Sequence, residues 1–401
     1  MRCHREVLTG VALLICLTPS FAAQKKLAEG PSENAAEEAA TVELVMAAGI
    51  AHLVGGQESI GKAEEKWEWP YEGVYREGGK IPLGYRVGGT SICAWALLDG
   101  LQASQDDVTG AATNAATNAA IERATRFVLA ALDQPPMQPG FSGGYDVRNW
   151  GTIYALNFLL RLEALDATPT AQKDIVPARI QWLVDTLQSD AIPETGGWNY
   201  ARRGGAGASA ASSPFMTAPA ILALWQADAQ GYAINAAVVP LALKSLVAAK
   251  VANGVYAYTS AGGLSKMPGT IGRSPAVEVV LGLAGLSSEK DLRISVVNFL
   301  EQWPELEKRR AKTGTHKGDY GIAPYYFYYA HYYASLAIEN LPVEQRPELR
   351  KRFRARLFSS MDMETLTFND RVFDRSSHFG TAMSLLALQQ QHLPLPAGPK
   401  D

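Results

Sequence analysis

A helical unit repeats six times along the chain, and this repeat constrains the fold more than any other feature of the sequence. Each copy has a glycine- or aromatic-rich loop followed by an apolar helix, as in "RNWGTIYALNFLL" and "SHFGTAMSLLALQ". The equivalent positions, which lie 62, 65, 58, 56 and 50 residues apart, are Thr90, Thr152, Thr217, Pro275, His331 and Thr381. A period of this kind indicates repeated units that bury their apolar faces against one another.

The residues at these positions also predict where the apolar helices begin. A threonine at a helix N-cap accepts a hydrogen bond from an N–H group of the first turn, so we expect the threonines to cap their helices. We expect Pro275 in the first turn of its helix, where a proline costs no hydrogen bond.

A second set of helices lies between the copies, expected at 42–54, 121–133, 176–187, 238–250, 292–302 and 348–358. These helices are amphipathic; Leu349, Phe353 and Leu357, for example, recur at the helical spacing of four residues. The repeated helices are apolar nearly all round and must be covered on most sides. The sequence therefore predicts an all-α protein, an α/α toroid with six inner and six outer helices around a central cavity.

The N-terminus has the features of a secretory signal peptide over residues 1–23. Arg2 and Arg5 precede the apolar run "VLTGVALLICL", and small residues around Ala22 and Ala23 fit a cleavage site. We expect a flexible lead-in at 24–40, the toroid at 41–390 and a disordered proline-rich tail at 391–401. The expected location is secreted or periplasmic, with no integral membrane segment after processing. The alternative is that the signal stays as a membrane anchor.

Charge and cysteine content exclude several functions. A formal net charge of −3 without a basic cluster argues against nucleic-acid binding. Signal removal leaves Cys93 as the last of three cysteines, so neither an internal disulfide nor a cysteine-rich zinc site is expected. The chain also lacks a phosphate-binding loop, His-Glu-x-x-His and Gly-x-Ser-x-Gly. We therefore expect no metal and no cofactor.

The loops before the inner helices should open at one end of the barrel, and they carry the candidate functional residues. Three of these are candidates for acid–base catalysis: Asp319, His316 and His378. An enzyme would need a pair such as Asp319 or His316 against His378 or Arg371. The candidates for ligand binding, chosen as aromatic or charged loop residues, are Asp146, Arg148, Trp150, Trp198, Tyr200, Tyr320, Tyr325, Tyr326, Tyr329, His331, Arg371 and Asp374.

Each candidate also has a structural interpretation. Asp146 and Arg148 can form a loop salt bridge while Trp150 packs between helices. The tyrosines can pack between the rings with their hydroxyls at a cavity wall. Glu278, an acidic residue in an apolar helix, must pair, for example with Arg273, or face a wet cavity.

At these loops and helices the chain resembles the prenyltransferase and squalene-oxidase repeat superfamily. The matching pieces are Gly143–Gly144–Tyr145, "GGWNY" at 196–200 and the helix "TAPAILALW". The stretches "DYGIAPYYFYYAHYYASLAIE" and "SHFGTAMSLLALQ" resemble secreted bacterial members of this group. The resemblance spans about residues 41–390 and implies the α/α-toroid fold, but members of the superfamily differ widely in function.

None of the known chemistries of that superfamily transfers to this chain. The cyclase motif Asp-x-Asp-Asp, the Asp-x-Cys element of zinc prenyltransferases and the thioester segment Gly-Cys-Gly-Glu-Gln are all absent. Cys93 lies in an apolar helix, where a buried free thiol is expected. The sequence favours an exported toroid that binds an unidentified ligand, such as an oligosaccharide or isoprenoid, or a partner at its aromatic, loop-lined cavity. The alternative is an enzyme, either a polysaccharide lyase or hydrolase or a terpene-cyclase-like enzyme acting on an isoprenoid.

Overall fold

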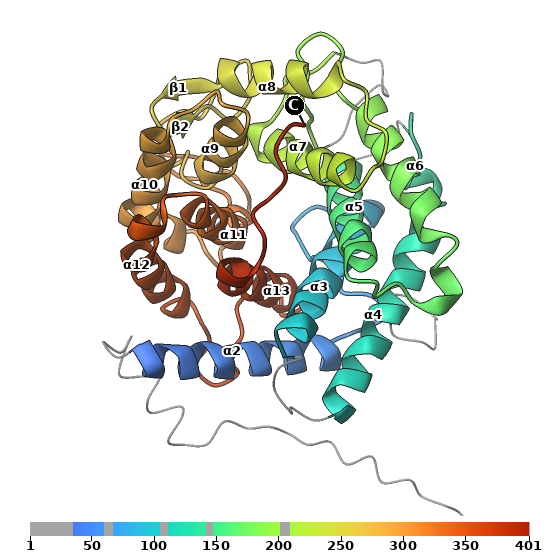
Figure 1. Cartoon of the computed structure of the whole chain (residues 1–401). Coiled ribbons are helices and arrows are strands. Elements are labelled where there is room, and N and C mark those ends of the chain that lie inside the picture. The colour runs from blue at the N-terminus through green and yellow to red at the C-terminus, as the bar shows by residue number, and fades with distance from the viewer. Residues whose placement is uncertain (1–34, 60–66, 105–110, 142–146, 201–208, 401) are drawn as a thin grey trace, which may run out of the picture.

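Twelve α-helices form two concentric rings in the computed structural model, which describes residues 35–59, 67–104, 111–141, 147–200 and 209–400 (Figure 1). The inner ring consists of α3 (Leu83–Ser104), α5 (Arg148–Ala164), α7 (Pro214–Ala229), α9 (Ser274–Leu283), α11 (Tyr326–Glu339) and α13 (Ser376–Gln389). The outer ring consists of α2 (Ala35–Gly55), α4 (Ala111–Leu132), α6 (Val176–Ser189), α8 (Val238–Ala248), α10 (Glu289–Glu307) and α12 (Arg346–Phe358). The predicted α/α toroid with six inner and six outer helices is therefore confirmed.

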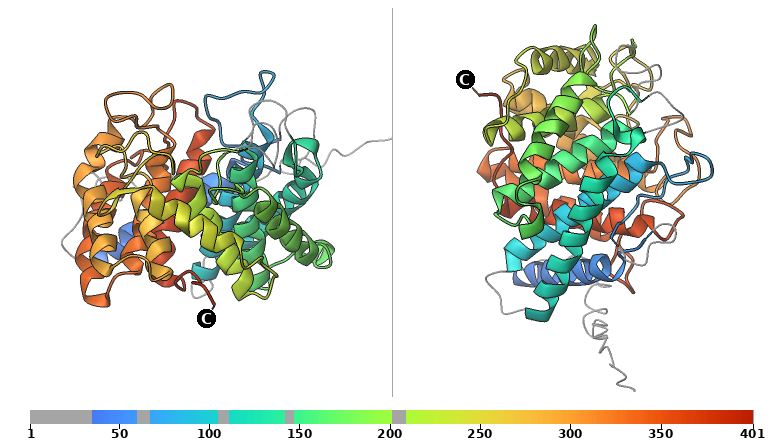
Figure 2. Two further views of the ribbon diagram at one scale, coloured as in Figure 1. Left: turned by 90° about the horizontal axis from the view of Figure 1, so that it is seen from above. Right: turned by 90° about the vertical axis from the view of Figure 1, so that its right-hand side faces the viewer.

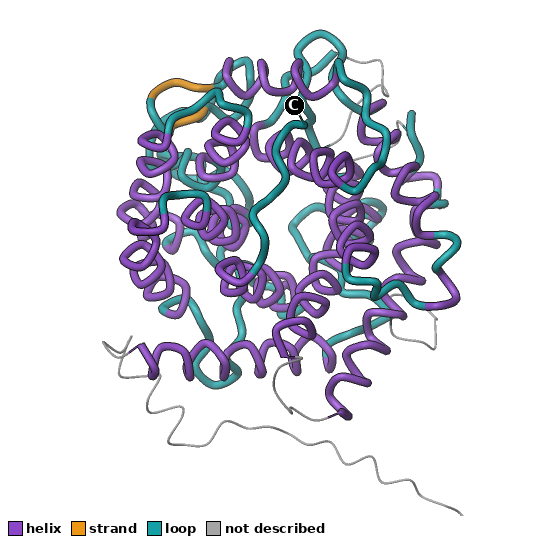
Figure 3. The backbone as a smooth tube through the Cα atoms, in the orientation of Figure 1, coloured by secondary structure: helices purple, strands orange, loops and turns teal. Residues whose placement is uncertain are grey.

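Other regular structure in the described residues is short and lies in the connections (Figure 3). The strands β1 (Lys250–Ala252) and β2 (Val255–Tyr256) pair antiparallel after α8. Four single turns of 3₁₀-helix are η1 (Pro135–Met137), η2 (Thr170–Gln172), η3 (Val343–Gln345) and η4 (Gln390–His392). No helix in the described ranges is both long enough and apolar enough to cross a membrane.

The two rings differ in burial as their sequence patterns predict. Every residue of α11 is buried, whereas α12 buries only Leu349, Phe353 and Leu357.

Glu278 of α9 is fully buried and forms an ion pair with Lys250, whose Nζ lies 3.7 Å from Oε1. It also accepts a hydrogen bond of 2.6 Å from the Tyr256 hydroxyl. The predicted pairing is confirmed, but the partner is Lys250 instead of Arg273.

The repeat threonines do not cap their helices, and this prediction is wrong. Thr217 and Thr381 lie inside α7 and α13, whose N-cap residues are Ser213 and Arg375. Their hydroxyls instead accept hydrogen bonds of 3.0 Å from backbone N–H groups of the preceding loops, those of Trp198 and Phe368. Thr90 does the same for Trp69, also at 3.0 Å. In these three copies the threonine binds the preceding loop to its inner helix, whereas the Thr152 hydroxyl donates to the Arg148 carbonyl within α5. Pro275 lies in the first turn of α9, as predicted.

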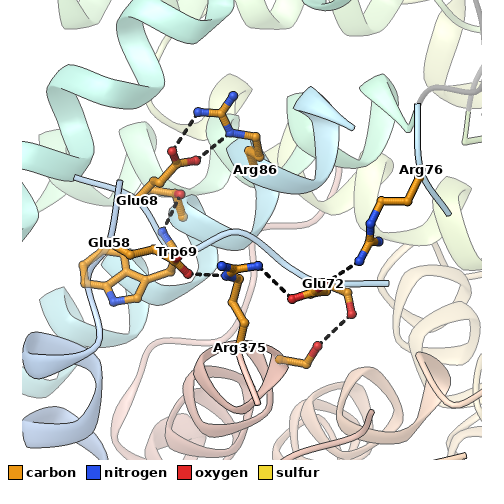
Figure 4. Close-up of polar contacts among 9 residues, drawn as sticks. Glu58, Glu68, Trp69, Glu72, Arg76, Arg86 and Arg375 are labelled. Atoms are coloured by element: carbon orange, nitrogen blue, oxygen red, sulfur yellow. Dashed lines mark hydrogen bonds and ion pairs between the residues drawn. The ribbon is translucent and has the colours of Figure 1, made fainter. Parts of the chain in front are cut away.

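Ion pairs between the first and last repeats close the ring (Figure 4). The Arg375 guanidinium, beside the start of α13, contacts Glu58 at 2.5 Å and Glu72 at 2.8 Å. Ser376 donates a hydrogen bond of 2.8 Å to the Glu72 carbonyl. Glu58 is fixed in turn by a backbone bridge to Glu68. Because these partners lie more than 300 residues apart in sequence, they lock the two ends of the repeat array together.

The barrel has two different ends (Figure 2). The long connections gather where the inner helices begin, which we call the loop end, and the C-terminal segment lies at the opposite tail end (Figure 2). Helix α2 begins at Ala35, earlier than the predicted toroid start at residue 41. The C-terminal segment is described as far as Lys400, which donates to the backbone carbonyl of Asp228 in α7.

Candidate functional site

Four half-buried aromatic side chains meet at the loop end, and we call them the tyrosine–histidine cluster: Tyr200, Tyr258, His316 and Tyr325. The Tyr200 hydroxyl donates to the Tyr325 hydroxyl at 3.0 Å. The Tyr325 hydroxyl lies 2.9 Å from His316 Nε2. The His316 ring packs edge-on against Tyr258, with ring centroids 4.8 Å apart. Polar atoms from two repeats therefore meet within hydrogen-bond distance, a tyrosine ring from a third repeat packs beside them, and each of these side chains is partly open to solvent.

The direction of the hydrogen bonds follows from the Gly321 carbonyl, which lies 2.7 Å from His316 Nδ1. A carbonyl only accepts, so Nδ1 carries the proton and Nε2 accepts from Tyr325. Burial lowers the pKa of His316, although its hydrogen bond to Gly321 opposes the shift, and burial raises the pKa of Tyr325 well above its usual value. The resting cluster is therefore neutral near pH 7, with a chain of protons directed from Tyr200 to His316.

Close packing in the loops holds Tyr200 in place. Gly196 and Gly197 adopt positive φ angles of +71° and +75°, which favour glycine. A side chain at Gly197 would come within 2.7 Å of Thr217 Oγ1. Trp198 is fully buried, and its indole N–H donates to the Leu187 carbonyl at 2.7 Å. Tyr200 follows this rigid turn, so its hydroxyl has little freedom to move.

Arg273 and Phe215 position the other side of the cluster. Arg273 is buried and donates from Nε to the carbonyls of Tyr256 and Ala257, each at 3.0 Å, which fixes the backbone that leads into Tyr258. The Phe215 ring lies 5.7 Å from the ring of Tyr200 and 5.4 Å from that of Tyr325. The buried residues Arg273 and Phe215 therefore hold the cluster in position, so that it does not depend on the loops alone.

Six predicted ligand-binding residues are core residues: Arg148, Trp150, Trp198, Tyr326, Tyr329 and His331. Arg148 forms a buried ion pair with Asp190 and donates from Nη1 to the Gln138 carbonyl at 2.8 Å. The Tyr329 hydroxyl donates to the Phe215 carbonyl at 3.0 Å. Burial shows that these six side chains have structural roles in the described core; the ion-pair partner of Arg148 is Asp190, whereas the expected partner Asp146 lies outside the described residues.

Trp150 belongs to an aromatic stack that fills the barrel just inside the loop end. Its ring packs against Tyr71, Tyr85, Tyr154 and Phe379, with centroids 5.2–6.0 Å apart. A Cβ atom at Gly88 would come within 2.3 Å of the Trp150 ring, so α3 needs a glycine where it passes. The stack forms the floor beneath the loops.

His331 lies between the rings of helices and is completely buried. Its Nε2 accepts from the Trp303 indole at 2.9 Å, and its Nδ1 donates to the Phe327 carbonyl at 2.7 Å. Burial lowers the pKa of His331 to about 3, so the folded protein keeps this ring neutral.

We therefore expect His331 to make the fold sensitive to acid. The unfolded chain binds a proton at His331 below about pH 6.5. The folded chain binds one only near pH 3, so stability falls as the pH falls between these values, by about 1 kcal/mol per pH unit. Urea unfolding at pH 7, 6 and 5 measures this slope, and His331→Gln should make it shallower by about that amount. Equal slopes in the two proteins would contradict the assignment.

His378 does not face the barrel mouth, which corrects its assignment to a loop at the mouth. It lies in the first turn of α13, and its ring packs 4.9 Å from that of His52 in α2. Burial lowers its pKa to about 3. None of the described hydrogen bonds joins Asp319 or His316 to His378 or Arg371, so the predicted acid–base pair does not form.

The remaining candidates lie apart from the cluster or outside the described residues. Asp319, Tyr320 and Asp374 are exposed, Arg371 is buried, and Asp146 lies outside the described residues. Sequence reasoning did not select Tyr258, and it noted Asp370 only as one of the charged residues of the last loop, without assigning it a role. Tyr258 lies in the aromatic loop "GVYAYTSAGG". The aromatic composition of this loop was the sequence feature that could have identified Tyr258 as a candidate.

Asp370 is a buried carboxyl group at the loop end. It accepts a hydrogen bond of 3.1 Å from the Tyr71 hydroxyl. Burial raises the pKa of Asp370 to about 7, although Arg371 and the bond from Tyr71 oppose the shift. A carboxyl group with this pKa can gain or lose a proton near neutral pH.

Potential metal ligands are dispersed in the part of the chain that the structure describes. It contains no group of three or more histidine, cysteine, aspartate or glutamate side chains placed to hold an ion. Cys93 is a buried free thiol, as predicted, and burial raises its pKa well above the usual value.

The fold and the loop-end cluster define an α/α toroid with polar and aromatic groups at one mouth, and solved structures share this fold. The α-1,6-mannanase GH76A from Salegentibacter sp. HEL1_6 matches with a TM-score of 0.50 and 11% identity, covering 86% of this chain and 98% of the mannanase. An inactive variant of that enzyme in complex with α-1,6-mannotriose matches with a TM-score of 0.49, 11% identity and the same coverage. No family model and no curated protein matches the sequence. The likeness is one of fold.

Proposed function

We propose that the protein is an exported enzyme that cleaves a polysaccharide at its loop end, with Tyr325 and His316 as its acid–base pair. The observation that carries this proposal is the hydrogen-bonded series Tyr200–Tyr325–His316, which is half-buried and lies where the long connections meet. The export signal at residues 1–23 is part of the proposal. The shared toroid fold of a mannanase is consistent with it.

The chemistry of the cluster favours β-elimination from a uronic-acid polysaccharide. In this reaction a base removes the proton from C5 of the sugar, the bond from C4 to the glycosidic oxygen breaks, and a C4=C5 double bond forms. The departing oxygen takes a proton. A tyrosine backed by a neutral histidine can donate and accept these protons near pH 7. The exposed faces of Tyr200 and Tyr258 would stack on sugar rings.

Hydrolysis is the second route by which this site would cleave a polysaccharide. It uses two facing carboxyl groups about 5–10 Å apart. Among the described carboxyl groups of the loop end, Asp370 is buried against Tyr71, Glu58 and Glu72 are paired with Arg375, and Asp319 and Asp374 are exposed. This arrangement favours elimination over hydrolysis.

A binding protein without catalysis is the other candidate, and it fits the resemblance to prenyltransferase and squalene-oxidase repeats. The observation that favours it is the set of half-buried aromatic rings at the loop end, those of Tyr200, Tyr258 and Tyr325, which an apolar ligand such as an isoprenoid could contact. Such a ligand would occupy the mouth of the barrel but would not need the proton chain.

A substrate panel tests the proposal with the protein lacking residues 1–23. Polyuronates such as alginate and pectate form one arm, and neutral polymers including α-1,6-mannan and xylan form the other. Elimination gives an ultraviolet absorbance from the new double bond together with new reducing ends, whereas hydrolysis gives reducing ends alone. We expect both signals in the polyuronate arm. If no polymer is cleaved in either arm, the enzyme proposal is wrong, and a melting temperature raised by a ligand would then support binding alone.

A further inference from the structure

A pocket lies at the tail end, among the C-terminal ends of four inner helices and away from the tyrosine–histidine cluster at the loop end. It has a volume of about 130 Å³. The C-terminal halves of α3, α5, α7 and α11 form its walls, and residues 393–396 of the tail form a cover. A site of this size is smaller than the roughly 300–1,000 Å³ of a typical drug-sized pocket, so it suits only a small ligand.

The pocket contains a buried carboxylate whose second oxygen is not satisfied. Asp99 of α3 is 1% exposed, and its Oδ1 accepts from Arg161 Nε at 2.5 Å. Its Oδ2 is buried without a hydrogen bond of good geometry, and a weaker hydrogen bond from Trp95 to the carboxylate offsets only part of the effect of burial on its pKa. Leaving a buried carboxylate oxygen unmatched is costly, so this atom needs a donor.

The same pocket contains a donor that lacks an acceptor. Gln230, the C-cap of α7, is half-buried, and its Nε2 has no hydrogen-bond partner. Both residues line the pocket, but these two atoms are themselves covered, so each side chain would have to turn for its atom to contact a ligand. A hydroxyl group donates and accepts at once, so a ligand with neighbouring hydroxyls satisfies Asp99 and Gln230 together.

We propose that the tail-end pocket is a binding site for a small polyhydroxylated molecule, of the size of a monosaccharide or cyclic polyol. Asp99 and Gln230 would bind its hydroxyl groups. Trp95 and Tyr332, whose rings meet edge to face at 5.7 Å, would cover its apolar face. This site is independent of the reaction proposed for the loop end.

Charged ligands fit the pocket less well. A metal ion or an ammonium group would satisfy Asp99, but neither can accept the Gln230 N–H. Both would also be repelled by Arg161, which lies in the same pocket. An anion would face the Asp99 carboxylate. A neutral polyol avoids both conflicts.

The tail holds the cover in place. Lys400 reaches Asp228 of α7, with Nζ 3.2 Å from Oδ1, and residues 393–399 contain three prolines that stiffen the segment. The ligand would enter when this contact opens.

Calorimetric titration of the protein without residues 1–23 tests the site with four probes: mannose, xylose, glucuronate and myo-inositol. We expect at least one neutral probe to bind, and Gln230→Met to weaken that binding about tenfold by removing one hydrogen bond. The matched control is Gln134→Met, because Gln134 is an exposed glutamine far from the pocket in sequence. This control should leave the affinity unchanged. Unaltered thermal unfolding of the Gln230 variant without ligand shows that it folds.

Two results would overturn the site. The first is no binding by any neutral probe, which would mean that water alone fills the pocket. The second is binding that Tyr325→Phe abolishes and Gln230→Met leaves intact, which would place the ligand at the loop end. Neither result depends on whether a polysaccharide is cleaved, so failure of this site and failure of the proposed enzyme are distinguishable.

Discussion

Tyr325→Phe is expected to lower the turnover of the preferred polysaccharide by about 100- to 10,000-fold, the usual contribution of a positioned acid–base group. The variant removes only the hydroxyl oxygen that links Tyr200 to His316. Its ring keeps the contacts with Phe215 and Tyr326, so the fold should be little affected. Steady-state kinetics on the polymer identified by the panel measure the effect, which should fall on kcat more than on KM.

Tyr320→Phe is the matched control, because it removes the same atom from an exposed tyrosine five residues earlier. It should retain nearly full activity. Equal losses in the two variants would point to a general effect on the loop. Full activity of Tyr325→Phe would show that the cluster takes no part in the reaction.

Arg148→Met is expected to destabilise the folded protein by about 3–5 kcal/mol, because it leaves the Asp190 carboxylate buried without its cation. Neither side chain of this ion pair is exposed to solvent. The variant also removes the donor to the Gln138 and Phe141 carbonyls. Urea unfolding of the two proteins gives the difference in the free energy of unfolding.

The double variant Arg148→Met, Asp190→Leu separates a structural role of Arg148 from a ligand-binding role. Removing both charges should recover a large part of the lost stability, since no unpaired charge remains. If Arg148→Met leaves stability unchanged but weakens substrate binding, then Arg148 belongs to the site after all.

The architecture was predictable because the repeat and the two helix types are local properties of the sequence. A buried helix such as α11 is apolar all round, and an outer helix such as α12 buries one face, so the pattern alone separates the two rings. Helix boundaries were less predictable. Four copies carry a threonine that was predicted to be a cap, but Thr90, Thr217 and Thr381 lie inside their helices and bind loops whose paths the sequence does not reveal.

The sequence predicted the region of the candidate site, the loops before the inner helices, but not the contacts within it. The aromatic loops were identified, and Tyr200, His316 and Tyr325 were among the candidates. The residue types alone could not show that His331 and Trp198 face the core, because the same aromatic residues occur at buried and at accessible positions. The contact between Tyr200 and Tyr325 was also hidden, since the two residues lie 125 positions apart and precede different inner helices.

The ion pairs that join Arg375 to Glu58 and Glu72 affect the order in which this chain can fold. A linear stack of repeats can fold progressively from one end. Here, however, α2 and α3 can contact α13 only after the chain beyond residue 375 has been synthesised. Contacts between such distant residues form slowly, because a long loop must close before they are made. A chain that stops before α13 would keep most of its helices and leave one side of α2 and α3 open to water. Helix α13 is therefore required to complete the toroid.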